Sequence, residues 1–121
     1  MYVETYREFA FDAAHELPPF SGLHGHTFVV RVWMRGEPDP VFGWAANLYE
    51  VDAAISRLKM LIDHKNLNDV EGLEVPSLEN LASWVCKKLS KDIPNIHRVD
   101  VERGFTGTKE GCVYYQPEAT A

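Results

Sequence analysis

The stretch Leu23-His24-Gly25-His26-Thr27 decides the interpretation of this chain, together with His15, nine residues before His24. In an extended segment, residues i and i+2 point to the same face, so His24 and His26 can project side by side. His15 can lie beside both imidazoles if the apolar segment that it closes pairs antiparallel with the segment starting at His26. Three neutral imidazoles with one open position are the ligand set of a catalytic zinc, so the spacing predicts a Zn²⁺ site. The alternative is that these histidines are ordinary polar residues at a strand end.

Two periodicities divide the rest of the chain into elements. Alternating apolar residues predict strands over residues 2–14, 26–35, 97–103 and 111–116. Apolar residues spaced at three and four predict two helices, one from about Asn47 to Ile62 and one from Ser77 to Leu89, with Asn47 and Ser77 as N-caps. The polar segment 63–68 between the helices is expected to be a loop.

The order ββααββ predicts a single α+β domain over residues 1–121. Both helices are expected to cover one face of an antiparallel sheet, because only that face then needs covering. Aromatic residues are expected to populate part of the other face, where they would make subunit contacts. They are Tyr2, Tyr6, Trp33, Tyr114 and Tyr115.

Composition excludes several classes of partner. The formal net charge of −6 and the scattered Lys and Arg residues argue against nucleic acid or an anionic membrane as a partner. The two cysteines, Cys86 and Cys112, do not amount to a disulfide framework, and no apolar stretch approaches membrane-spanning length. We therefore expect a cytoplasmic protein.

Four further residues have side chains that could take part in a reaction, and each also has an ordinary structural interpretation. Asp63 next to His64 can orient an imidazole for proton transfer, although a solvated aspartate beside a C-capping histidine would have the same sequence. Glu102 lies on the wetter face of a predicted strand. It can accept two parallel hydrogen bonds from a guanidine-like heterocycle, or it can be an ordinary solvated glutamate. Cys86 lies on the flank of an apolar helix stripe, which favours core packing.

Taken together, the motifs resemble the family of 6-pyruvoyl tetrahydropterin synthase and 6-carboxytetrahydropterin synthase (queuosine pathway). The motifs occur in family order and cover nearly the whole chain. They are Phe11-Asp12-Ala13-Ala14-His15, Leu23-His24-Gly25-His26, Gly36-Glu37-Pro38-Asp39-Pro40 with Gly43 and Asn47-Leu48, Asp63-His64-Lys65-Asn66-Leu67-Asn68, Pro76-Ser77-Leu78-Glu79-Asn80 and Val99-Asp100-Val101-Glu102.

The resemblance implies a tunnelling fold (T-fold), in which ββααββ subunits form trimers that stack into a homohexamer. It implies that His15, His24 and His26 bind Zn²⁺. It also implies that Glu102 anchors a pterin ring beside Ser77, and that Asp63 and His64 are the acid–base dyad. In the family the pterin site lies at a subunit interface, so zinc and Glu102 need not act from one chain.

One departure from the family pattern bears on the reaction. Family synthases carry a catalytic cysteine a few residues before the HxH motif, and the segment from Glu16 to Leu23 contains none. Phe20 stands four positions before His24, and Arg103 follows Glu102 where the family usually has a small hydroxyl residue. We therefore expect a divergent member: a zinc-dependent lyase acting on the side chain of a dihydropterin, dihydroneopterin or its triphosphate, with ordinary synthase activity absent or weak. The alternative is a non-catalytic pterin-binding homologue; a structural hexamer with vestigial histidines is a third.

Overall fold

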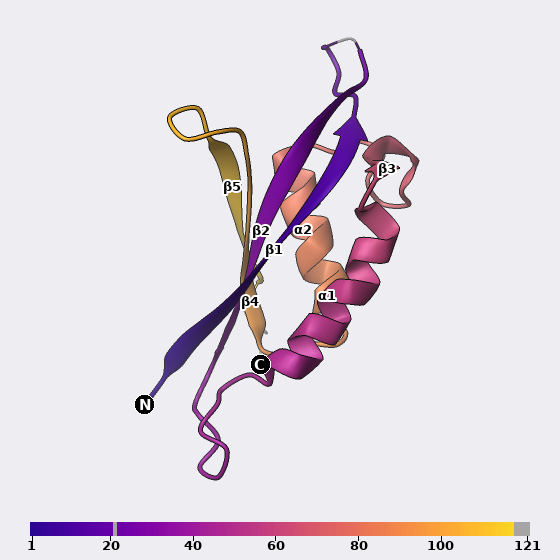
Figure 1. The fold of residues 1–121 in the computed structure, drawn as a ribbon. Helices are drawn as coiled ribbons and strands as arrows, with labels where there is room; N and C mark the ends of the chain where they lie inside the picture. Colours follow the sequence, from indigo (N-terminus) through magenta and orange to yellow (C-terminus); the bar gives the residue numbers. More distant parts are fainter. Residues whose placement is uncertain (21, 118–121) are drawn as a thin grey trace.

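The computed structural model describes residues 1–20 and 22–117. Two long strands form a hairpin, two helices follow, and a second hairpin ends the described chain (Figure 1). The elements are β1 (Val3–His15), β2 (His24–Gly36), α1 (Leu48–Ile62), β3 (Lys65–Asn66), a 3₁₀ turn (Leu67–Asp69), α2 (Leu78–Leu89), β4 (Ile96–Arg103) and β5 (Glu110–Tyr115). The predicted order ββααββ is confirmed, with one short strand added.

The sheet has the strand order β3-β1-β2-β4-β5. All neighbours pair antiparallel except β3, which pairs parallel with the end of β1 through Ala13 and Ala14. This parallel pair makes the sheet mixed rather than purely antiparallel. The sequence predicts only a loop over residues 63–68, so the prediction is wrong at Lys65 and Asn66. A two-residue strand has no periodicity of its own, and it forms because α1 returns the chain to the edge of β1.

The two helices begin where the sequence predicted. The side chain of Asn47 accepts a hydrogen bond from the backbone N–H of Tyr49 at 3.0 Å, and the hydroxyl of Ser77 accepts one from Asn80 at 3.1 Å. These bonds satisfy backbone donors that have no partner inside the helix. No helix in the described part of the chain is long and apolar enough to cross a membrane.

The core lies between one face of the sheet and the two helices (Figure 1). α1 packs on β1, and α2 packs on β4 and β5. Alternate strand residues supply the sheet side of this core, and the largest of them are fully buried, including Phe28, Val30, Val32 and Val99. Period-two alternation along each strand thus separates a covered helix-side face from an opposite face without helices.

The expectation for the aromatic residues is corrected at one position. Tyr114 is the cross-strand partner of Val99, so it lies on the helix-side face and packs against the core. Tyr6 and Trp33 are cross-strand partners on the opposite face, with ring centroids 4.7 Å apart. Tyr115 is 62% exposed. Tyr114 and Tyr115 are consecutive residues of β5, so the alternation of strand side chains places them on opposite faces.

Candidate metal centre

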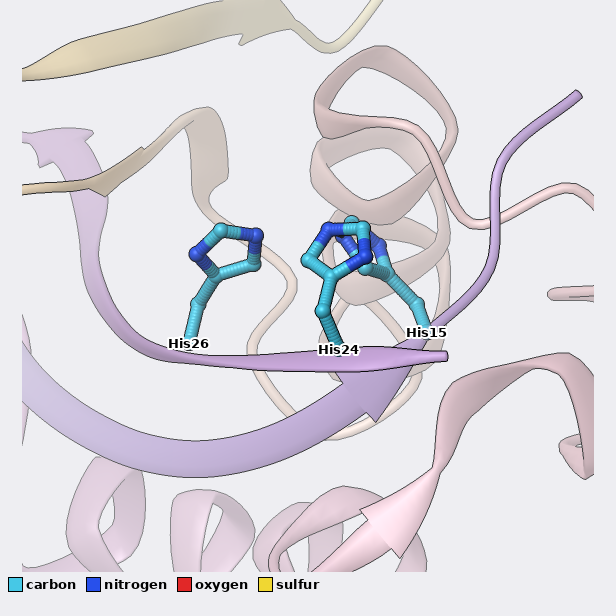
Figure 2. Close-up of side chains that lie close together, drawn as sticks. All are labelled: His15, His24 and His26. Atoms are coloured by element: carbon cyan, nitrogen blue, oxygen red, sulfur yellow. Dashed lines mark hydrogen bonds between the residues drawn. The ribbon is translucent and has the colours of Figure 1, made fainter. Parts of the chain in front are cut away.

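The β1–β2 hairpin brings the three predicted histidines together. Its register pairs His15 with His24 and Ala13 with His26, so all three imidazoles rise from the helix-side face (Figure 2). One ring nitrogen of each lies within 4.8 Å of the others. β2 starts at His24, two residues earlier than the sequence suggested, and this extension is what places His24 in the sheet beside His15.

Backbone carbonyls orient two of the rings. Nδ1 of His15 lies 3.0 Å from the carbonyl oxygen of Pro76, and Nδ1 of His24 lies 3.2 Å from that of Gly22. A carbonyl only accepts, so each Nδ1 donates and each Nε2 is left with a lone pair. The two Nε2 atoms lie 3.0 Å apart and face one another, an arrangement that a cation between them would stabilise.

The third ring completes a donor set that fits zinc. Nε2 of His26 is buried and has no hydrogen-bond partner among the described residues. Buried polar atoms are normally satisfied, so an orphaned nitrogen facing two others indicates a missing ligand. Three imidazole nitrogens with supporting carbonyls are the donor set and support that catalytic zinc sites use.

Burial lowers the pKa of two of the three histidines. The pKa of His15 is lowered chiefly by desolvation, against a hydrogen bond to Pro76 that raises it, with further lowering by His24 and then by the positive charge of Arg103. The pKa of His26 is also lowered, first by desolvation and then by Arg103. Neutral imidazole is the form that binds a metal, so both rings are ready ligands at neutral pH.

The side chains of Asp63 and His64 contact each other at the end of α1. Oδ1 of Asp63 lies 3.1 Å from Nδ1 of His64 and accepts a hydrogen bond of 3.0 Å from the backbone N–H of Asp12. These contacts, the Asp12 bond first, lower the pKa of Asp63 and keep it ionised. His64 has a φ of 60°, a strained conformation for a residue with a side chain, and strain of this kind concentrates at functional sites.

A pocket of about 740 Å³ is lined by His26 of the histidine cluster and by His64 of the Asp63–His64 pair. This volume lies within the range of small-molecule sites. The remaining lining residues are Asp12, Ala13, Ala14, Gly25, Thr27, Lys65, Asn66, Gly104 and Phe105.

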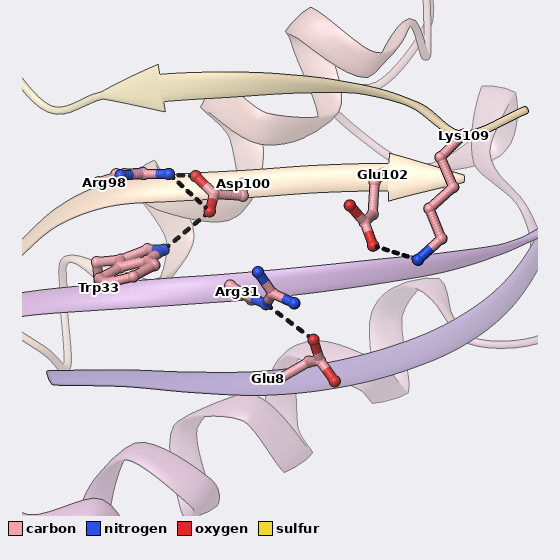
Figure 3. Close-up of polar contacts among 7 residues, drawn as sticks. All are labelled: Glu8, Arg31, Trp33, Arg98, Asp100, Glu102 and Lys109. Carbon is pink, nitrogen blue, oxygen red and sulfur yellow. Dashed lines mark hydrogen bonds and ion pairs between the residues drawn. The ribbon is translucent and has the colours of Figure 1, made fainter. Parts of the chain in front are cut away.

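Glu102 lies on the other side of the sheet. Its cross-strand partner is Val29, so it projects from the face opposite the histidines, among charged pairs such as Glu8–Arg31 and Arg98–Asp100 (Figure 3). Its Oε1 lies 3.5 Å from Nζ of Lys109. Within one chain, therefore, the structure does not bring Glu102 and the cluster to one face.

Ser77 is linked to the histidine cluster through the preceding residue and not through its own side chain. Its hydroxyl caps α2, and the carbonyl that contacts His15 belongs to the preceding residue, Pro76. The structure thus shows the capping role of Ser77.

The chain is similar to known proteins over most of its length. The sequence profile described as 6-pyruvoyl tetrahydropterin synthase matches residues 4–117. The chain belongs to this family of pterin lyases. It is 36% identical to the 6-carboxy-5,6,7,8-tetrahydropterin synthase of Synechocystis sp. over 123 aligned residues, which cover 93% of this chain and 92% of the relative. It is 31% identical to the dihydroneopterin monophosphate aldolase of Pyrococcus furiosus over 87 residues, covering 70% of this chain and 73% of the aldolase.

The fold agrees with membership of the 6-pyruvoyl tetrahydropterin synthase family. The structure is similar to that of Caenorhabditis elegans 6-pyruvoyl tetrahydropterin synthase, with a TM-score of 0.84, 26% identity and 97% of each chain covered. The predicted T-fold is thereby confirmed, and the histidine cluster is consistent with the zinc site of this family.

The contacts that three residues make around the histidine cluster were not predicted from the sequence. Pro76 lies 61 residues from the imidazole that its carbonyl contacts, and no local pattern marks such a carbonyl. Asn68 clamps the end of β1, since its side chain accepts from the backbone N–H of Glu16 at 2.8 Å and donates to its carbonyl at 2.9 Å. Arg103 was visible in the sequence only as a departure from the family pattern; the structure places it 3.3 Å from Nε2 of His15.

Proposed function

We propose that this chain is a zinc-dependent lyase that acts on the side chain of a dihydropterin, dihydroneopterin or its triphosphate. The observation that carries the proposal is the set of three facing imidazole nitrogens, one of them from His26, which lines a pocket together with His64. Zinc bound there would polarise a hydroxyl or carbonyl oxygen of the substrate side chain as a Lewis acid. The names of the two relatives both specify reduced pterins but two different reactions, which supports the ligand class more than one particular reaction.

In this proposal each remaining site residue has one role. Glu102 accepts hydrogen bonds from the N–H and NH₂ edge of the pterin ring, and Ser77 lies beside the ring. His64, oriented by the ionised Asp63, moves protons at the substrate side chain. Because Glu102 and the histidines project from opposite faces of one sheet, the complete site requires two chains.

The segment before the HxH motif limits the reaction. No residue from Glu16 to Leu23 is a cysteine, and Phe20 has no group that takes up a proton. The two cysteines are poor substitutes, because burial raises the pKa of the Cys86 thiol to about 11 and raises that of Cys112 as well. Glu16, the ionisable residue of the segment, accepts a hydrogen bond from the backbone N–H of Gly22 at 3.1 Å. We therefore propose that ordinary synthase activity is absent or slow.

The same segment favours a second candidate, a non-catalytic pterin-binding homologue. Such a protein would keep Glu102 and the fold while turnover is lost with the family cysteine. In this case the histidine cluster would still bind zinc, and the pterin would be released without having reacted.

Turnover separates the two candidates. We expect the purified protein with zinc to convert dihydroneopterin or its triphosphate slowly, and His64→Ala to lower the rate by about 10²- to 10⁴-fold, as loss of a proton-transfer group does. Products are followed by chromatography with fluorescence detection. Tight binding without conversion would support the second candidate, and neither binding nor conversion would contradict both.

We further propose that the chain assembles into a homohexamer, a dimer of trimers, in the cytoplasm. Large side chains on the face without helices support this, among them Tyr6 at 55% and Tyr115 at 62% exposed. Stable assemblies of this kind bury large apolar interfaces, so we expect a hexamer by light scattering at micromolar concentration. A monomer under these conditions would contradict the assembly and, with it, a site shared between chains.

A further inference from the structure

Arg103, the last residue of β4, places a positive charge against the histidine cluster. Its cross-strand partner is Phe28, so its side chain projects from the same face as His24 and His26. The side chain is only 15% exposed, and its Nη1 lies 3.3 Å from Nε2 of His15. A guanidinium therefore contacts an atom that we propose as a zinc ligand.

The contact between Arg103 and Nε2 of His15 cannot form while that nitrogen binds a metal. Nδ1 of His15 donates to the carbonyl of Pro76, so Nε2 carries the lone pair, and Arg103 is the donor to it. One lone pair cannot accept from Arg103 and bind zinc at the same time. Arginine also keeps its charge at every relevant pH, and a like charge this close disfavours a cation. Metal binding thus requires Nη1 to leave His15.

The other contacts of Arg103 show which of its guanidinium N–H groups can bind a ligand once Nη1 has moved away from His15. Its Nε donates to Oε1 of Glu110 at 2.7 Å, which holds one side of the group in place. Glu110 is 60% exposed, so solvent screens its charge. Among the described residues none accepts a hydrogen bond from Nη2. A guanidinium held at Nε presents its two Nη groups as a fork that matches two oxygens of an oxyanion.

We propose that Arg103 couples the metal site to an anion. An oxyanion group of the ligand takes up the guanidinium released from His15, so zinc and the anion bind together more tightly than either binds alone. Arg103 is then a specificity residue that favours ligands whose side chain carries phosphate or carboxylate. This inference rests on the zinc site of the proposed function.

The test measures zinc affinity in the full-length protein by competition with a chromophoric chelator, calibrated at each anion concentration. Methyl phosphate and acetate are the two probes, and they distinguish phosphate from carboxylate. We expect at least one of them to tighten zinc binding by the wild type by about tenfold, in the range of ordinary coupling between sites. Because the coupling is reciprocal, zinc should tighten binding of that anion by the same factor.

Arg103→Met removes the charge and keeps a side chain of similar length. We expect it to bind zinc about tenfold more tightly than the wild type without anion, and to lose the response to anion. Arg31→Met is the matched control, because Arg31 also pairs with a glutamate, Glu8 at 2.9 Å, but on the opposite face of the sheet. This control should keep both the zinc affinity and the anion response of the wild type.

Three results would overturn the inference: a wild-type zinc affinity that neither anion changes, an anion response that persists in Arg103→Met, or weaker zinc binding in that variant. The wild-type measurement needs no substitution, so a misfolded variant does not decide the question. If the wild type binds zinc tightly and independently of anion, this inference alone fails. If the wild type binds no zinc, the proposed zinc site fails and the inference falls with it.

Discussion

Replacing His24 with alanine is expected to abolish the stoichiometric zinc binding, one zinc per chain, that we propose for the wild type. His24 supplies one of three imidazole nitrogens and faces Nε2 of His15 at 3.0 Å. Loss of a residue that only supports a ligand lowers metal affinity by about 10- to 100-fold, and loss of the ligand itself should cost more. Because His24 is exposed at a strand end, the substitution should leave the fold intact.

Metal content after dialysis, measured by atomic emission, checks this expectation, with circular dichroism as the test of folding. His97→Ala is the matched control. His97 also lies in the sheet, but its imidazole contacts Glu4 at 3.0 Å and belongs to another part of the structure. Zinc content in His24→Ala equal to that of the wild type would rule out the three-histidine site.

Glu102→Gln is expected to weaken pterin binding by about 30- to 150-fold, with no change in zinc content. The amide presents one acceptor and one donor where the ring edge offers two donors, so one contact becomes unfavourable. Losing a charge-assisted pair of this kind should cost about 2–3 kcal/mol. The carboxylate is accessible to a ligand, because its side chain is 34% exposed and its ion pair with Lys109 is long, at 3.5 Å.

Calorimetric titration with neopterin measures this effect. Glu8→Gln is the control, since Glu8 is a glutamate on the same face of the sheet that pairs with Arg31 (Figure 3). We expect pterin affinity in this control to equal that of the wild type. If Glu102→Gln also kept wild-type affinity, the proposed ring site would be wrong, and with it the main argument for pterin chemistry in this chain.

His24 and Glu102 lie on opposite faces of one sheet. The histidines share the helix-side face with Phe28, and Glu102 shares the other face with Val29. A ligand that contacts both sets must therefore meet residues from more than one chain. This geometry makes the proposed hexamer part of the chemistry rather than a separate property.

The sequence by itself determined the element order and the identity of the clustered histidines. Asn47 and Ser77 cap helices because their side chains reach their own neighbouring backbone, an interaction that local sequence specifies. His15, His24 and His26 come together as soon as two consecutive strands pair in a hairpin. A hairpin is the simplest connection for consecutive antiparallel segments, so the spacing was enough to predict the cluster.

Only the tertiary structure decided what surrounds those histidines. The carbonyl of Pro76 reaches His15 across 61 residues, and Arg103 reaches it across 88. The short β3 and the side of the sheet on which Glu102 lies relative to the histidines depend in the same way on pairing between distant segments. Register governs such contacts, and a slip of one residue would exchange every inward side chain for an outward one. Local propensity contains no information on register between β2 and β4, because packing of the whole core against the two helices selects it.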